Sequence, residues 1–201
     1  MALPSFAQIS LRKAFDIDAD NKADYMVFRP ENNTWYIRSS AGVIRSQQWG
    51  VANDDWMVPG DYDNDGKADI AVWREPTGVW YIIPSSTNTF TTQTWGVPGD
   101  EPVARDWDGD GKTDLAVVRR TGGNMIWYIF SSLTGGFEGR QFGASTDFTA
   151  PGDYDGDGKF DVAVQRPGAT PTSPATFYIN TGTSFEFYTF GQSNDLVAPG
   201  D

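Results

Sequence analysis

Four nine-residue segments concentrate aspartate at a spacing that suits cation binding. Each has Asp at positions 1, 3, 5 and 9 and Lys at position 7, and they span residues 16–24, 61–69, 106–114 and 153–161. Alternate carboxylates on a short loop converge on one point, where they repel one another unless a cation lies among them. A hard divalent cation with oxygen ligands fits, and Ca²⁺ accepts crowded, irregular coordination more readily than Mg²⁺.

The aspartates of all four segments are therefore predicted metal ligands. Position 6, where the loop must turn sharply, is Gly66, Gly111 and Gly158 in three segments and Asn21 in the first. Glycine makes such a turn at little steric cost, and Asn also visits the left-handed region. One such loop could be a solvated hairpin turn, but four in register favour calcium. The predicted side-chain ligands are Asp16, Asp18, Asp20, Asp24, Asp61, Asp63, Asp65, Asp69, Asp106, Asp108, Asp110, Asp114, Asp153, Asp155, Asp157 and Asp161.

The acidity of the chain belongs to these loops. The 201 residues carry 27 acidic and 15 basic side chains, a net charge of −12. Apart from the sixteen loop aspartates, 11 acidic and 15 basic residues remain, and up to four bound Ca²⁺ would reduce the net charge to −4. No basic stripe is available to release counterions, so a nucleic-acid partner is disfavoured.

The composition also disfavours an enzyme. The chain has no Cys and no His, which removes thiol nucleophiles, disulfides, the usual zinc ligands and the commonest general base. Paired carboxylates can hydrolyse glycosides, but here every aspartate pair is assigned to a metal loop. No apolar run approaches the length of a membrane span, so no membrane insertion is expected.

The elements that must position the loops are strands. After each loop comes a segment such as Ile70–Arg74, then an aromatic segment such as Trp80–Ile82, then a third that ends at an aromatic residue and Gly, as at Trp95–Gly96. No window shows helical periodicity, and turn residues separate these segments. Loops that start 45, 45 and 47 residues apart, with four strands per unit, are typical of β-propeller blades. We predict an all-β propeller of four-stranded antiparallel blades.

The predicted organisation is a lead-in at residues 1–10 followed by repeats over 11–201. The units span approximately 11–55, 56–101, 102–147 and 148–195, with the start of a fifth at 196–201. Both ends carry a segment that leads into an acidic loop, and we expect a longer repeat array that belongs to a larger propeller. The alternatives are displacement of the first strand by the last, or completion by a second chain.

The segment Gly60–Arg74, followed by Val79–Ile82, resembles the bacterial FG-GAP/VCBS repeat, which is similar to blades of the integrin α-subunit and of some fungal propeller lectins. The resemblance covers residues 11–201 and implies calcium in the hairpin loops. It also implies backbone-carbonyl ligands at Lys22, Lys67, Lys112 and Lys159. Asn21 departs from the glycine of the pattern. Proteins of the family serve adhesion, glycan binding or scaffolding.

Recurrent aromatic and arginine residues have a structural and a functional interpretation. Trp35, Trp80 and Trp127 share one repeat position and Trp49 and Trp95 another, which favours packing between blades over sugar platforms. Trp107 lies inside a loop and is expected to cover the flank of the ion. An arginine 13 residues after each loop begins (Arg29, Arg74, Arg119, Arg166) favours a structural ion pair over an anion site.

Two functions remain after these exclusions. The first is a non-catalytic, extracellular, calcium-stabilised interaction or assembly module with a protein partner or its own copies. The alternative is a glycan-binding propeller. The extracellular location is inferred from the loops, since weak calcium sites need millimolar Ca²⁺. Residues 1–8 have no basic segment or sustained apolar core, so they do not form a secretory signal as they stand.

Overall fold

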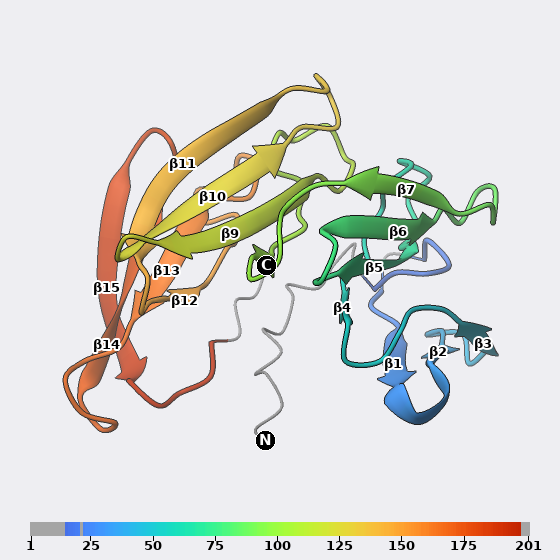
Figure 1. Cartoon of the computed structure of the whole chain (residues 1–201), viewed down its shortest axis with the longest axis horizontal. Helices are drawn as coiled ribbons and strands as arrows, with labels where there is room; N and C mark the ends of the chain where they lie inside the picture. Colours follow the sequence, from blue (N-terminus) through green and yellow to red (C-terminus); the bar gives the residue numbers. More distant parts are fainter. Residues whose placement is uncertain (1–14, 21, 198–201) are drawn as a thin grey trace. The chain divides into compact units, whose positions relative to one another are not determined.

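The computed structural model describes residues 15–20 and 22–197 (Figure 1). The expectations about the lead-in, the first strand of the first unit, Asn21 and the last residues therefore concern positions outside the described residues. Within them the chain is all-β, with one short 3₁₀ helix, η1 (Pro30–Asn32). No described helix has the length and apolar character needed to cross a membrane.

The strands form four antiparallel sheets in chain order. The first sheet has three described strands: β1 (Tyr25–Arg29), β2 (Thr34–Arg38) and β3 (Ile44–Gln48). The second contains β4 (Asp55–Met57), β5 (Ile70–Arg74), β6 (Val79–Ile83) and β7 (Thr91–Thr94). The third contains β8 (Glu101–Pro102), β9 (Leu115–Thr121), β10 (Asn124–Phe130) and β11 (Phe137–Ala144). The fourth contains β12 (Phe148–Thr149), β13 (Val162–Arg166), β14 (Pro174–Asn180) and β15 (Phe185–Gln192).

Burial along the strands follows their position in each sheet. In the second, third and fourth sheets, the second strand has consecutive buried residues and is buried on both faces, as in β9, where Leu115–Val118 are all buried. The next strand alternates, so that in β10 every second side chain is buried. The outer strands β3 and β7 are exposed along their whole length. A sheet covered on both faces near its inner strands and open at its outer edge explains these patterns.

The chain divides into two compact units, and the boundary passes through the third sheet. The described part of the first unit comprises residues 15–20, 22–119 and 127–139, and that of the second comprises 120–126 and 140–197.

In the first unit, consecutive sheets pack face to face. Trp73 and Trp80 of the second sheet, both fully buried, pack in one cluster with Leu115 and Val117 of the third. Ile37 of the first sheet packs with residues of the second in another cluster. Trp35, Trp80 and Trp127 are all at most 1% exposed, which confirms the prediction that they belong to the core.

In the second unit, the third and fourth sheets pack in the same way. Gly143 lies so close to Met125 and Val164 that a Cβ at this position would be 3.0 and 2.9 Å from their side chains. Sequential four-stranded antiparallel sheets that stack through their faces are the blades of a β-propeller. The predicted fold class is thereby confirmed.

Candidate metal centre

In the second, third and fourth blades, the acidic loop connects the first strand to the second. In three blades an antiparallel bridge closes the loop by pairing position 9 with the residue before position 1: Gly60 with Asp69, Arg105 with Asp114, and Gly152 with Asp161. In the first blade the N–H of Asp24 donates to the carbonyl oxygen of Phe15 at 2.7 Å. Backbone pairing therefore holds the two ends of each loop together.

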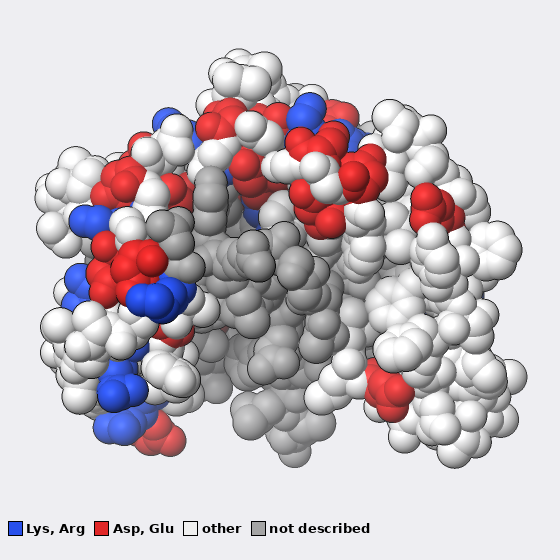
Figure 2. Space-filling model, turned by 180° about the vertical axis from the view of Figure 1, so that it is seen from behind, with Lys and Arg blue, Asp and Glu red and all other residues white. Residues whose placement is uncertain are grey.

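Three of the four predicted carboxylates converge in every loop. Oxygen atoms of the aspartates at positions 1, 3 and 9 lie within 4.8 Å of one another. The groups are Asp16–Asp18–Asp24, Asp61–Asp63–Asp69, Asp106–Asp108–Asp114 and Asp153–Asp155–Asp161. The aspartate at position 5, which the sequence also suggested as a ligand, lies outside these groups. Figure 2 shows acidic side chains gathered in compact clusters on the surface.

Main-chain N–H groups of the loop fix the carboxylate at position 1. Asp61 accepts hydrogen bonds from Asn64 at 2.7 Å and from Gly66 at 2.9 Å, one on each oxygen. Asp106 makes the corresponding bonds with Gly109 and Gly111 at 2.7 and 2.9 Å. The turn needs positive φ at two residues, here 64° at Asn64 and 82° at Gly66. Asn and Gly tolerate this conformation, which explains their placement.

The carboxylate at position 9 is buried in every loop. Asp69 and Asp114 are 1% and 0% exposed, and one oxygen of each accepts the N–H of position 2 at 2.8 Å. Burial raises the pKa of Asp69 from 3.8 to about 7 and the pKa of Asp114 to about 6, although backbone hydrogen bonds oppose the shift. Burial also raises the pKa of Asp61, Asp106 and Asp161. The charged form of these carboxylates is thus disfavoured in the metal-free loop.

The donor set fits a hard cation. Each group offers three carboxylate oxygens and neither nitrogen nor sulfur, the combination that Ca²⁺ and Mg²⁺ prefer. A divalent ion would supply the positive charge that the buried carboxylates need in order to remain ionised. In the first loop, Lys22 Nζ pairs with Asp20 at 3.0 Å, but both side chains there reach solvent. These aspartate clusters could therefore hold a metal ion.

The aromatic residue at position 2 anchors the loop to the strand before it. Tyr62 and Tyr154 donate their hydroxyl protons to the carbonyl oxygens of Val58 and Ala150 at 2.6 and 2.8 Å. Trp107 donates its indole N–H to Val103 at 3.1 Å and is 3% exposed. The sequence suggested that Trp107 covers the flank of the ion; the structure places its ring against Trp127, at 5.7 Å between centroids.

Neighbouring loops of the first unit are joined by their backbones. The N–H of Ala68, at position 8 of the second loop, donates to the carbonyl oxygen of Asp16 at 2.6 Å. Thr113 donates to Asp61 in the same way, also at 2.6 Å. Sequence reasoning missed this link because a main-chain bond imposes no residue type at either end.

Comparison with known families assigns the repeat. Residues 16–72 and 106–164, together more than half of the chain, match the family model described as the FG-GAP-like repeat. The chain belongs to this family. Both matched segments of the FG-GAP-like repeat begin at the first aspartate of an acidic loop. Comparison with curated proteins gives no match. Comparison with solved structures also gives none.

Three FG-GAP-like blades also contain a paired arginine. Arg74 binds both oxygens of Asp55, on the adjacent strand, at 2.8 and 3.0 Å. Arg119 binds Asp100 and Arg166 binds Asp147 in the same bidentate manner. The structural interpretation of these arginines is therefore supported, with a partner in their own blade. The constant separation of 19 residues between acid and base was a signal in the sequence that the analysis missed.

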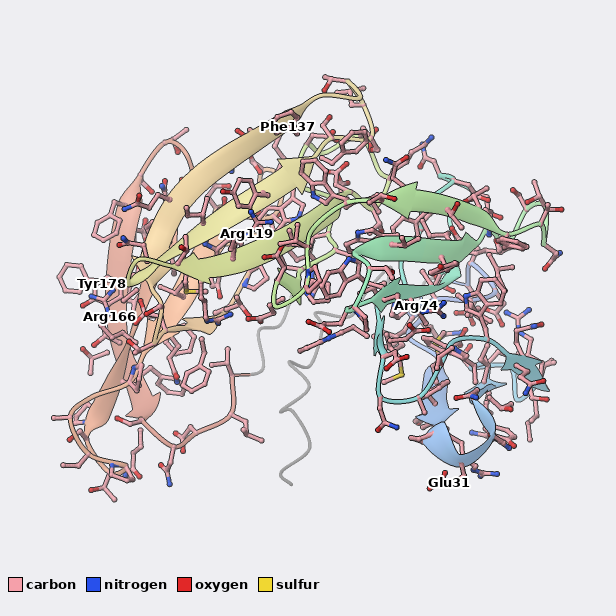
Figure 3. The ribbon with its side chains drawn as sticks, viewed as in Figure 1. Glu31, Arg74, Arg119, Phe137, Arg166 and Tyr178 are labelled. Atoms are coloured by element: carbon pink, nitrogen blue, oxygen red, sulfur yellow. The ribbon has the colours of Figure 1, made fainter. Side chains whose placement is uncertain are left out.

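A groove between the first and second FG-GAP-like blades is lined by residues whose types recur at equivalent positions in the later blades. A cavity of about 220 Å³ in the first unit is lined by Trp49, Gly50, Val72, Arg74, Tyr81 and Phe90. The equivalent residues at the next pair of blades in that unit are Trp95, Gly96, Val117, Arg119, Tyr128 and Phe137. Those of the second unit are Phe142, Gly143, Val164, Arg166, Tyr178 and Phe185. In each, the arginine lies over the tyrosine ring, at 4.4, 4.8 and 4.7 Å; Figure 3 labels Arg166 and Tyr178 side by side.

The aromatic residues of the groove differ in burial. Trp49 and Trp95 are half-buried, and their indole N–H groups donate to Tyr81 and Tyr128 carbonyls of the following blade at 3.3 and 3.2 Å. They therefore join blades, as the sequence suggested, but at the groove rather than in the closed core. Phe90 and Phe137 remain 57% and 71% exposed.

Proposed function

We propose that the chain is a non-catalytic, calcium-stabilised β-propeller module that binds a protein partner or further copies of its own kind in an extracellular setting. The observation that carries the proposal is the convergence of three carboxylate oxygens within 4.8 Å in all four loops. Membership of the FG-GAP-like family, whose repeats often bind calcium, supports it.

Calcium would be held by the aspartates at positions 1, 3 and 9, with those at position 5 and the carbonyls of the lysines at position 7 as further ligands. The bound ion supplies positive charge and a fixed centre for the loop. The chain itself contributes the orientation, because backbone N–H groups already hold the position 1 and position 9 carboxylates in place. A loop fixed in this way gives the blade a rigid rim on which a partner can bind.

A non-catalytic role is supported by how the acidic groups are used. The buried aspartates outside the loops, Asp100 and Asp147, are paired with arginines, and those inside the loops accept backbone hydrogen bonds. The sequence has no His or Cys to act as base or nucleophile. FG-GAP-like repeats are typically non-enzymatic and typical of extracellular proteins, which agrees with sites that fill at millimolar Ca²⁺.

Calorimetric titration tests the proposal. Metal-stripped protein is titrated with Ca²⁺ and, in parallel, with Mg²⁺, and thermal unfolding is followed with and without EGTA. Binding of several Ca²⁺ per chain, weaker binding of Mg²⁺ and a higher melting temperature with Ca²⁺ are expected. Absence of calcium binding together with an unchanged melting curve would refute the metal assignment.

The groove beside Phe90, whose lining residue types recur in the later blades, favours glycan binding as a second candidate function. Exposed Phe90 and Phe137 beside an ordered arginine could stack on a sugar ring and hydrogen-bond its hydroxyl groups. However, two N–H groups of each arginine are already directed to an aspartate, and the indoles bind backbone carbonyls. A glycan array decides between the two: binding that Phe137→Ala abolishes, with folding intact, would favour the lectin, and a blank array favours the protein module.

A further inference from the structure

Each blade has a second hairpin, and in the first three blades this hairpin donates hydrogen bonds to the acidic loop of the same blade. This hairpin follows β2, β6, β10 and β14, whose last residues are Arg38, Ile83, Phe130 and Asn180. Two residues further along the chain stands Ser40, Ser85, Ser132 or Gly182. The fourth blade therefore has no side chain where the other three have a hydroxyl group.

The serine joins two aspartates of its loop. In the second blade, the N–H of Ser85 donates to Asp69 and its hydroxyl donates to Asp65, both at 2.6 Å. In the third blade, Ser132 makes the same two bonds, to Asp114 at 2.7 Å and to Asp110 at 2.9 Å. One residue thus orients the carboxylates at positions 9 and 5 together.

The first blade repeats the arrangement. The N–H of Ser40 donates to Asp24 at 2.7 Å, and its hydroxyl donates to Asp20. Asp20 is also paired with Lys22, so the first loop differs from the second and third in the partners of its position 5 carboxylate.

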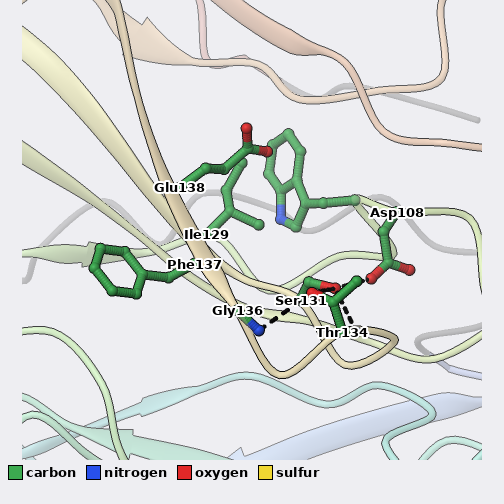
Figure 4. A pocket seen from close by; sticks show the side chains of 8 residues that line it. Asp108, Ile129, Ser131, Thr134, Gly136, Phe137 and Glu138 are labelled. Atoms are coloured by element: carbon green, nitrogen blue, oxygen red, sulfur yellow. Dashed lines mark hydrogen bonds between the residues drawn. The ribbon is translucent and has the colours of Figure 1, made fainter.

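A second serine holds the carboxylate at position 3. The hydroxyl groups of Ser86 and Ser131 donate to Asp63 and Asp108, each at 2.5 Å. Figure 4 shows Ser131 and Thr134 beside Asp108 at the end of the hairpin, with Phe137 directed away from them. Three of the four carboxylates in the second and third loops therefore have a partner in the hairpin.

The hairpin of the fourth blade makes its hydrogen bonds within itself. The N–H of Gly182 donates to the side chain of Asn180 at 3.0 Å, and Thr181 bonds to Thr183 and Ser184. In the part of the chain that the structure describes, no hydrogen bond joins residues 181–184 to an aspartate of residues 153–161. The loop itself is otherwise alike, because Asp157 accepts the N–H of Lys159 at 2.9 Å as Asp65 accepts that of Lys67.

We propose that these hairpin serines set the relative calcium affinities of the loops. The second and third loops then bind Ca²⁺ tightly, and the fourth binds it about 10–100-fold more weakly. A carboxylate has about four lone-pair sites, so it can accept a serine proton and still bind a metal. The hydroxyl fixes the carboxylate in one orientation before the ion arrives, and Asp157 must instead be ordered on binding. This inference rests on the proposed calcium function and makes the serines positioning residues for it.

The test is calorimetric titration of the full metal-stripped chain with Ca²⁺. The wild type should show at least two classes of site. Asp155→Asn, in the fourth loop, should remove one site from the weak class and leave the tight class intact. Ser85→Ala and Ser132→Ala should each move one site from the tight class to the weak class.

Two further variants separate positioning from general damage. Thr87→Ala removes a hydroxyl from the same hairpin that bonds only within it, so the titration should match the wild type. Ser85→Thr keeps a hydroxyl group and, unlike Ser85→Ala, should bind Ca²⁺ as tightly as the wild type does. Circular dichroism of the calcium-loaded variants verifies folding.

The outcomes distinguish the two proposals. If no Ca²⁺ binds to the wild type, the calcium function itself is wrong. If Ca²⁺ binds to sites of equal affinity, or if Ser85→Ala and Ser132→Ala both titrate like the wild type, the proposal that the serines set the affinities is wrong. The calcium function then still stands. If Ser85→Ala unfolds, the Ser132→Ala and Asp155→Asn titrations decide.

Discussion

The main-chain N–H of Thr113 donates a hydrogen bond to the carbonyl oxygen of Asp61 at 2.6 Å, across the interface between the second and third blades. Asp61 opens one acidic loop, and Thr113 precedes Asp114, which closes the next. Two candidate metal centres are therefore joined through backbone atoms rather than through side chains. The same region is tightly packed, because a Cβ at Gly60 would lie 2.4 Å from Thr113 Oγ1.

This packing predicts a strong effect of Gly60→Ala. The added methyl group must displace Thr113 from its position, and overpacking of this kind typically costs about 1–3 kcal/mol in the free energy of unfolding. Thr113→Ala removes the two nearest atoms and should recover part of the loss in the double variant. Chemical denaturation of the four proteins of this double-mutant cycle measures the coupling, and additive effects would contradict the close contact.

Metal removal is expected to lower stability. An ion that binds only the folded chain stabilises it by about 2.7 kcal/mol per site when its concentration is a hundredfold above the dissociation constant. EGTA should therefore lower the melting temperature markedly, and Asp63→Ala or Asp108→Ala should reproduce part of that decrease in the presence of Ca²⁺. A melting temperature that does not respond to EGTA would contradict the calcium sites.

The metal-free protein should lose stability as pH rises. Burial raises the pKa of Asp69 to about 7 and that of Asp114 to about 6, whereas both carboxyls titrate near 3.8 without that burial. The folded state thus holds these protons more tightly, so their contribution to the unfolding free energy is greatest at low pH and falls between about pH 4 and 7.

Melting temperatures measured in EGTA across this pH range test the sign. They should decrease as pH rises, and the decrease should be smaller in Asp69→Asn/Asp114→Asn. With saturating Ca²⁺ the trend should weaken or reverse, because protons then compete with the ion for the same oxygens. A metal-free protein whose melting temperature rises steadily from pH 4 to 7, with no change in the double variant, would show that these two carboxyls do not govern the response.

The acidic loops could be predicted from the sequence because the types of their side chains indicate which kind of ion they can bind. Asp at alternate positions with Gly66 or Gly111 at the turn fixes both the ligand type and the backbone conformation, and the structure brings positions 1, 3 and 9 together as a result. The blades were predictable for a similar reason, because buried Trp80 and Trp127 recur at one position.

Other parts of the site could be predicted from the sequence only weakly or not at all. The hydroxyl of Ser85 reaches Asp65, 20 residues away, and nothing in the local pattern around Ser85 indicates that the two side chains meet. The bond from Thr113 to Asp61 uses only backbone atoms, so any residue except proline could make it. The pairing of Asp55 with Arg74 was accessible in principle, through its regular spacing, but needed the strand register to be interpreted as a contact.

The last prediction concerns the indole that joins two blades. Trp95 packs against Phe130 and Phe137, at 5.4 and 5.5 Å between ring centroids, and donates its N–H to the carbonyl oxygen of Tyr128 at 3.2 Å. The equivalent residue of the third blade is Phe142, which packs against Phe185 at 6.1 Å without an N–H group to donate. A phenylalanine therefore fits this kind of position, and the hydrogen bond can be removed with most of the ring contact kept.

Trp95→Phe should accordingly cost about 0.5–1.5 kcal/mol, the usual net value of one hydrogen bond, plus a small loss of buried area. Trp95→Ala should cost about 3–5 kcal/mol, because it also empties the space between the blades. Urea denaturation of the two variants measures both values. Equal costs would mean that the indole N–H, rather than the ring, accounts for the stabilisation, whereas a cost for Trp95→Phe close to zero would mean that the Tyr128 carbonyl finds another donor, such as water entering at the groove.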